Sequence, residues 1–121
     1  MATPIYSTLT TIRQDVYTDK AAAPFQHVFS QAIRSGNKIY CSGSVGLSTK
    51  TGTLVEGGIQ AETERVLDNL EAVLNEADTG LDKVIKVNVY LKDIARDFSA
   101  MNEVYVRRFA MPMPEQNSSQ N

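Results

Sequence analysis

Two pairs of polar residues have types and spacings that suit the binding of a small polar ligand. Ser42 and Gly43 stand at the end of a short apolar run, where the Gly43 N–H can donate to a carboxylate. Asn102 and Tyr105 are three residues apart, so on a helix their side chains project from one face. Each pair also has a plainer interpretation. Ser42 and Gly43 then form a strand end with a bulge, while Asn102 makes a helix-cap contact and Tyr105 packs at the core edge.

The remaining reactive side chains give little support for other chemistry. His27 is the only histidine, and a lone histidine beside a strand is most often structural or solvated. Cys41 is the only cysteine, which excludes an internal disulfide. No base partner for it is evident, so we predict a small buried side chain rather than a nucleophile. These residues cannot form a metal-ligand cluster, and we expect no metal.

The strongest periodic pattern is an amphipathic helix over residues 59–78. Gly80 follows it and is predicted to cap its C-terminal end. Such a helix needs an apolar surface to cover its stripe. The expected apolar stripe consists of Ile59, Val66, Leu67, Leu70, Val73, Leu74 and Ala77, with Thr63 as a weak member. The expected polar face consists of Glu62, Glu64, Arg65, Asp68, Asn69, Glu71, Asn75 and Glu76.

The other predicted elements supply a sheet and a second helix. Apolar and polar residues alternate most clearly over residues 83–92, as in a half-buried strand. A second helix is predicted over residues 98–109, with Asp97 as its N-cap. Gly43 and Gly46 permit close backbone approaches. This order predicts an α+β fold with two helices on one face of a mostly antiparallel sheet. The predicted strands are residues 28–33, 39–42, 53–55 and 83–92.

Length and charge limit the organisation and the partners. The 121 residues suit one domain, which we divide into a flexible segment (1–26), a core (27–109) and a disordered polar tail (110–121). The net charge of −2, without a basic run, argues against nucleic acid and membrane partners. The N-terminus lacks a secretory signal and is a poor mitochondrial presequence, so we expect a cytoplasmic protein, with mitochondria as the alternative.

Several motifs, in unbroken order over residues 27–109, together resemble the RidA/YjgF family of imine and enamine deaminases. The resemblance implies a chorismate-mutase-like fold, a homotrimer with active sites between subunits, and hydrolysis of small 2-imino acids to 2-keto acids and ammonia without a cofactor. The motifs are Phe29-Ser30-Gln31-Ala32, Ser42-Gly43, Lys50-Thr51-Gly52, Leu67-Asp68-Asn69-Leu70, the run 84–93, and the set Phe98, Met101-Asn102, Tyr105 and Phe109.

The resemblance also identifies site residues and departures from the family pattern. It implies a substrate-binding role for Phe29, Ser42, Gly43, Asn102 and Tyr105. The family's carboxylate-binding arginine would fall at position 116, which is glutamine here, and its water-positioning glutamate and last two strands find no counterpart. Three alternatives therefore stay open: an active deaminase, a catalytically silent member that binds a ligand or partner subunits, and a poorly folding truncated product.

Overall fold

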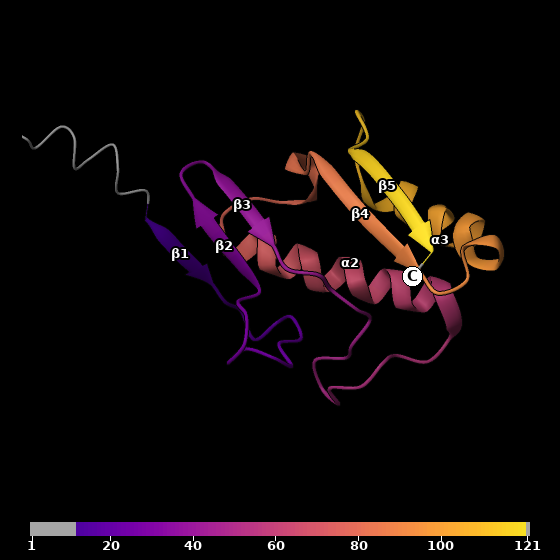
Figure 1. Cartoon of the computed structure of the whole chain (residues 1–121), viewed down its shortest axis with the longest axis horizontal. Coiled ribbons are helices and arrows are strands. Elements are labelled where there is room, and N and C mark those ends of the chain that lie inside the picture. The colour runs from indigo at the N-terminus through magenta and orange to yellow at the C-terminus, as the bar shows by residue number, and fades with distance from the viewer. Residues whose placement is uncertain (1–11, 121) are drawn as a thin grey trace, which may run out of the picture.

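The computed structural model describes residues 12–120 and contains two long helices and two small sheets (Figure 1). A single 3-10 turn, η1, joins the first long helix to the second sheet. The elements in chain order are β1 (Arg13–Val16), β2 (Ala32–Ser35), β3 (Lys38–Cys41), α2 (Gly58–Glu76), η1 (Leu81–Lys83), β4 (Lys86–Leu91), α3 (Ile94–Arg108) and β5 (Glu115–Gln120).

The strands pair in two ways. β1, β2 and β3 form an antiparallel sheet in that order, and Gly36 adopts the left-handed conformation (φ 60°) in the tight turn between β2 and β3. β4 and β5 form a parallel pair with Val87 opposite Gln116 and Val89 opposite Ser118. Helices combined with a mainly antiparallel set of strands confirm the predicted α+β class.

Helix α2 packs against both sheets. Leu67 and Leu74 join a buried cluster with Leu91 of β4 and Val104 of α3. A second buried cluster joins α2 to the first sheet through Val73, Ala77, Val16 and Ala32. Ile39 of β3 packs against both clusters. The predicted apolar stripe thus does cover a sheet surface, and the hydrophobic effect holds the two sheets to one helix.

The C-terminal end of α2 is closed by Asp78 rather than by Gly80. Asp78 has a φ of 63°, the left-handed conformation that aspartate tolerates better than most residues. The Asp78 N–H donates to Asn75 O (3.0 Å), and the Thr79 N–H donates to Leu74 O (2.9 Å), which together form a Schellman motif. Gly80 itself is extended. The predicted cap position was therefore wrong by two residues.

Helix α3 also begins earlier than predicted. Asp93 is its N-cap, since its Oδ1 accepts from the Arg96 N–H at 3.1 Å. Asp97, the predicted cap, lies inside the first turn, where it is buried and accepts two hydrogen bonds from the Arg96 guanidinium, each 2.9 Å. That arrangement lowers the pKa of Asp97, chiefly through the Arg96 hydrogen bond.

Several predicted strand and tail boundaries differ in the structure. Residues around 25–29 form a turn, since the N–H groups of Val28 and Phe29 both donate to Phe25 O, so the strand starts at Ala32. Of residues 53–55, Leu54 alone bridges to Leu47. In the segment expected to be flexible (1–26), residues 13–16 form β1, and residues 1–11 lie outside the described part.

The C-terminal segment differs most from its prediction. Residues 115–120 form β5 rather than a disordered tail, and they supply a strand beyond the four that the sequence predicts. Their composition is poor for a strand, but pairing with β4 at six positions overrides that preference. Two polar side chains of β5 hydrogen-bond to α3: Gln120 Oε1 accepts from the Ile94 N–H at 3.2 Å, and Gln116 Nε2 donates to Asn102 Oδ1 at 3.1 Å.

Candidate active site

A polar cluster lies where β5 crosses α3. We define it as Asn102 and Tyr105 of α3 with Gln116 and Ser118 of β5. The Gln116 amide donates from Nε2 to Asn102 Oδ1 (3.1 Å), and the Ser118 hydroxyl donates to Gln116 Oε1 (2.5 Å). Asn102 and Tyr105 are three residues apart on one face of α3, and Gln116 and Ser118 are two residues apart on one side of β5. The four side chains therefore meet between α3 and β5.

Tyr105 is the unusual member of the polar cluster. The residue is only 4% exposed, and its hydroxyl has no hydrogen-bond partner among the described residues. Burial raises the pKa of Tyr105, and the neighbouring Gln116 amide lowers it by a smaller amount. The hydroxyl therefore keeps its proton at neutral pH. A buried donor without a partner costs free energy, which a suitable ligand would recover.

Apolar groups surround the polar cluster on its inner side. The Tyr105 ring packs on Phe109 with centroids 4.6 Å apart, and both residues belong to the main buried core. Val87 and Val89 of β4 stand opposite Gln116 and Ser118 in register. The other three cluster residues are only half-buried, so solvent reaches the cluster from one side. Hydrogen bonds in such a setting are stronger than in open water.

The other predicted site residues form a separate group near β3. The Ser42 hydroxyl donates to Ser30 O (2.7 Å), and its N–H donates to Gln31 O (3.0 Å). Gly43 is exposed, and a Cβ at this position would meet no atom within 4 Å. Phe29 is 46% exposed, with its ring 5.9 Å from that of Phe25. Within residues 12–120, no hydrogen bond joins this second group to the polar cluster.

Of the five predicted site residues, only Asn102 and Tyr105 therefore lie in the polar cluster. It adds Gln116 and Ser118, which the sequence places in a tail without periodicity. The one available signal was their spacing of two, which puts both side chains on the same side of a strand. Cys41 also differs from its prediction, since it is exposed rather than buried.

Two motif residues, the half-buried Gln31 and the buried Asn69, hold loop backbone through their side-chain amides. Gln31 accepts from the Thr18 N–H (2.8 Å) and donates to Thr18 O and Ala21 O (3.0 and 3.2 Å). Asn69, expected on the polar face of α2, is 3% exposed and donates to Leu47 O at 3.1 Å. Each amide supplies hydrogen bonds to backbone groups of a loop.

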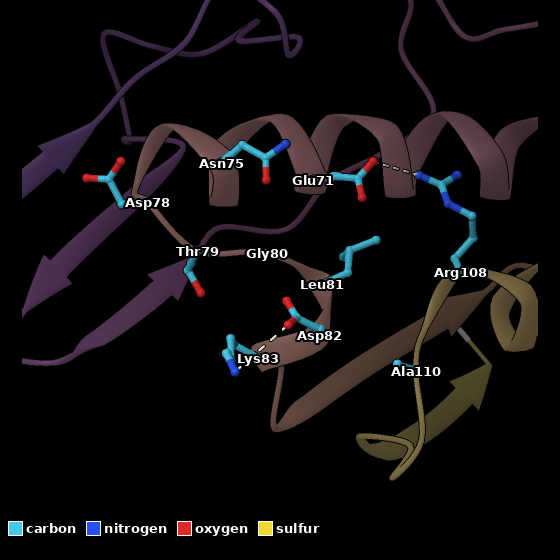
Figure 2. A pocket seen from close by; sticks show the side chains of 10 residues that line it. All are labelled: Glu71, Asn75, Asp78, Thr79, Gly80, Leu81, Asp82, Lys83, Arg108 and Ala110. Carbon is cyan, nitrogen blue, oxygen red and sulfur yellow. Dashed lines mark hydrogen bonds and ion pairs between the residues drawn. The ribbon is translucent and has the colours of Figure 1, made fainter.

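A cleft of about 490 Å³ lies elsewhere, at the C-terminal end of α2 (Figure 2). None of the predicted site residues lines it. Four of its charged side chains are paired: Arg108 Nη2 lies 3.5 Å from Glu71 Oε1, and Lys83 Nζ lies 3.9 Å from Asp82 Oδ2. Charges that are already paired leave little to attract a ligand, so we do not assign this cleft as the active site.

Arg108 is held by α2 rather than offered to a substrate. It contacts Glu64 at 2.7 Å and Asp68 at 2.9 Å as well as Glu71, and its side chain is 19% exposed. Burial lowers the pKa of Arg108, but the hydrogen bonds and charges of Glu64 and Asp68 outweigh burial and leave the pKa raised. The guanidinium therefore stays charged and binds α3 to α2, although a place at the end of a helix would suggest a solvated side chain.

Metal-binding and membrane-spanning features are both missing from residues 12–120. No group of three or more His, Cys, Asp or Glu side chains is placed there to hold a metal ion. No helix in this part of the chain has the length and apolar character needed to cross a membrane.

The sequence and the fold match known proteins closely. A family model described as Endoribonuclease L-PSP matches residues 19–119. A RutC family protein of Drosophila melanogaster is 43% identical over 111 residues, covering 92% of this chain and 79% of the relative. The 2-iminobutanoate/2-iminopropanoate deaminase of Dermatophagoides farinae is 32% identical over 90 residues, covering 74% and 70%.

The solved structures agree with these relatives. RidA from an Antarctic Psychrobacter species superposes with a TM-score of 0.84 at 38% identity, covering 90% of this chain and 86% of that one. The fold is therefore the chorismate-mutase-like α+β fold that the motifs implied. The chain belongs to the RidA/YjgF family, as its sequence motifs indicated.

Proposed function

We propose that this chain is a RidA-type deaminase that hydrolyses small, reactive 2-imino compounds to ketones and ammonia. The observation that carries the proposal is the buried, unpartnered Tyr105 hydroxyl beside the Asn102–Gln116–Ser118 hydrogen bonds. Relatives that are named as deaminases share its sequence at 32–34% identity. A few convergent polar groups against an apolar surround are typical of small-molecule sites.

The reaction needs binding and proton placement more than a strong nucleophile. Water adds to the carbon of the C=N bond, its proton passes to the nitrogen, and the resulting carbinolamine releases ammonia to leave a C=O group. The neutral Tyr105 hydroxyl can donate a hydrogen bond to the imine nitrogen or to the oxygen that forms. The amides of Asn102 and Gln116 can hold the rest of the substrate.

The second group of predicted residues fits this proposal if the protein is a homotrimer. Phe29, Ser42 and Gly43 are separate from the polar cluster within one copy. We propose that they face the polar cluster of a neighbouring copy, so that each site lies between two subunits. Thirteen large apolar residues between positions 12 and 120 are more than a third exposed, which leaves surface for such contacts. Light scattering after size exclusion should then give about three times the 13.3 kDa chain mass.

The description of the family model also names an endoribonuclease, but the polar cluster suits that activity less well. Phosphate binding usually depends on arginine, lysine or a metal. The net charge of the chain is −2, and Gln116, Asn102 and Tyr105 are all neutral. We therefore favour a small, weakly charged substrate over RNA.

The function is tested by competition between the protein and a chemical trap. An amino-acid oxidase generates 2-iminopropanoate and 2-iminobutanoate, and semicarbazide traps the imine that survives. We expect the protein to accelerate ammonia release in proportion to its concentration. Tyr105→Phe should lower that rate at least about tenfold, because it removes the buried hydroxyl donor of the polar cluster. Tyr90→Phe is the matched control, since Tyr90 is 67% exposed on β4. Wild-type protein that accelerates the decay of no imine, charged or neutral, would refute the proposal.

A further inference from the structure

The polar cluster contains donors and acceptors but no charge. Gln116 donates to Asn102 and accepts from Ser118, which leaves the Asn102 amide N–H groups for a ligand. The Gln116 amide also lies close enough to the Tyr105 hydroxyl to lower its pKa. Tyr105 adds a third donor. Among residues 12–120, no lysine or arginine hydrogen-bonds to any of the four cluster residues, and no charged group contributes to the raised pKa of Tyr105.

Arg108 lies three residues after Tyr105 on α3, but its guanidinium already has ion-pair partners. Arg108 binds Glu64, Asp68 and Glu71 on α2. Drawing it to the polar cluster would leave Glu64 and Glu71 without this cation, and Asp68 with only Arg65 at 3.9 Å. Arg107 is exposed at the end of α3. Within one copy, the polar cluster therefore offers a ligand dipoles but no cation.

This arrangement discriminates against anions. A carboxylate that enters a half-buried site loses water, and without a cation the lost hydration is only partly replaced. A carboxamide of the same size carries no charge, and it offers both a carbonyl acceptor and N–H donors. The side-chain amides of Gln116 and Asn102 can hydrogen-bond both to its carbonyl and to its N–H groups.

We infer that Gln116 makes this polar cluster select small imines that carry a neutral carboxamide, or a similar uncharged polar group, in place of a carboxylate. The inference rests on the proposed function for the place of the site, and it adds the substrate class. Gln116 acts as a specificity-determining residue, because it is the cluster member whose replacement by a cation would reverse the preference.

Two stable ketones of equal size test the inference without turnover. Pyruvamide and pyruvate differ in one amide against one carboxylate, and calorimetry measures the Kd of each. We expect wild-type protein to bind pyruvamide at least about tenfold tighter, a ratio worth about 1.4 kcal/mol. Tyr105→Phe should weaken pyruvamide binding, which places the ligand at the polar cluster. Equal or tighter binding of pyruvate by the wild type, or no binding of either ketone at millimolar concentration, would overturn the inference.

A substitution provides the reverse test. Gln116→Arg should reverse the ratio in favour of pyruvate, and its pyruvate binding should weaken as salt is raised, because a charge pair is screened. Circular dichroism checks that this variant is folded. If it is not folded, the ratio of the pyruvate and pyruvamide Kd values of the wild-type protein decides the inference. Imine hydrolysis is scored separately. Wild-type protein that binds pyruvamide but hydrolyses no imine refutes the proposed function, whereas protein that hydrolyses 2-iminopropanoate faster than 2-iminopropanamide refutes only the inferred preference.

Discussion

The two faces of α3 are held in opposite ways. On the side toward α2, Met101 and Val104 are 3% and 1% exposed and pack into a continuous apolar core with Leu67. On the side toward β5, contact is made by side-chain amides and hydroxyls, such as the Gln116–Asn102 hydrogen bond. Apolar burial supplies most of the folding free energy, whereas a hydrogen bond exchanged with water adds little.

This contrast separates stability from chemistry along one helix. Truncating a side chain on the α2 side should destabilise the fold, because the residues there are closely packed and a cavity would remain. The β5 side keeps a buried hydroxyl without a partner, which a protein selected for stability alone would not retain. Substitutions on the two sides should therefore have different signatures.

The largest effect is expected from the apolar side. Leu67→Ala should lower the free energy of unfolding by about 3 kcal/mol, because it removes a 3% exposed side chain from the main core and leaves a cavity. Urea titration followed by circular dichroism measures the change. Leu54→Ala is the control, since Leu54 is 52% exposed and should change stability by less than about 0.5 kcal/mol. Similar losses in the two variants would contradict the assigned core.

A close backbone contact should give the next largest effect. A Cβ at Gly46 would lie 3.0 Å from Glu62 O and 3.1 Å from Glu62 Cα, both backbone atoms of α2. Gly46→Ala should therefore lower the unfolding free energy by about 1–3 kcal/mol. Gly43→Ala is the matched change three residues earlier, where a Cβ meets no atom within 4 Å, and it should be nearly neutral. The thermal midpoints of the two variants would reverse their order if the loop packed differently.

The charged link between α2 and α3 should contribute less. Arg108→Met keeps the aliphatic stem but removes the cation from three carboxylates that are each 45–47% exposed. We expect a loss of about 1–2 kcal/mol, reduced by added salt because the partners are half in solvent. Arg107→Met should have no measurable effect. A loss for Arg108→Met that is unchanged at high salt would point to packing rather than charge.

The smallest stability change should come from the β5 side and have the opposite sign. Tyr105→Phe removes a buried hydroxyl that has no partner, so stability at pH 7 should stay equal or rise by up to about 1 kcal/mol. Imine hydrolysis should fall in the same variant. Gain of stability with loss of activity is the signature of a group kept for function. A clear loss of stability would show that the hydroxyl has a structural partner.

The same tyrosine predicts a dependence on high pH. Burial raises the pKa of Tyr105 above its ordinary value near 10, so the unfolded chain releases this proton first as pH rises. The stabilising contribution is complete below pH 10 and is lost as pH rises through the folded-state pKa. The unfolding free energy of wild-type protein should therefore decline above pH 10 more steeply than that of Tyr105→Phe. Parallel curves would contradict a buried phenol.

The sequence predicted the elements whose period is carried by apolar residues. The stripe of α2 from Ile59 to Ala77 and the alternation in β4 place both elements within a few residues. The buried side chain of Asn69 was missed, because an amide that clamps a loop interrupts the apolar period instead of extending it. The caps failed for a related reason, since Asp78 and Asp93 were chosen by local geometry among several acceptable candidates.

The candidate site was only half predictable. Asn102 and Tyr105 share a helix face, and their three-residue spacing is visible in the sequence. Gln116 and Ser118 reach them only because β5 pairs in parallel with β4, a contact between segments about 30 residues apart. Pairing of that kind is set by tertiary structure and not by the propensity of a polar segment. The separation of Ser42 and Gly43 from the polar cluster likewise appears only in three dimensions.

A crystal structure of the chain with pyruvamide would test most directly whether the polar cluster is the binding site. We expect the ligand beside Gln116, with an oxygen or nitrogen about 3 Å from the Tyr105 hydroxyl, which would then have its partner. A ligand bound in the charged cleft at the end of α2, with Tyr105 still unpartnered, would contradict this account.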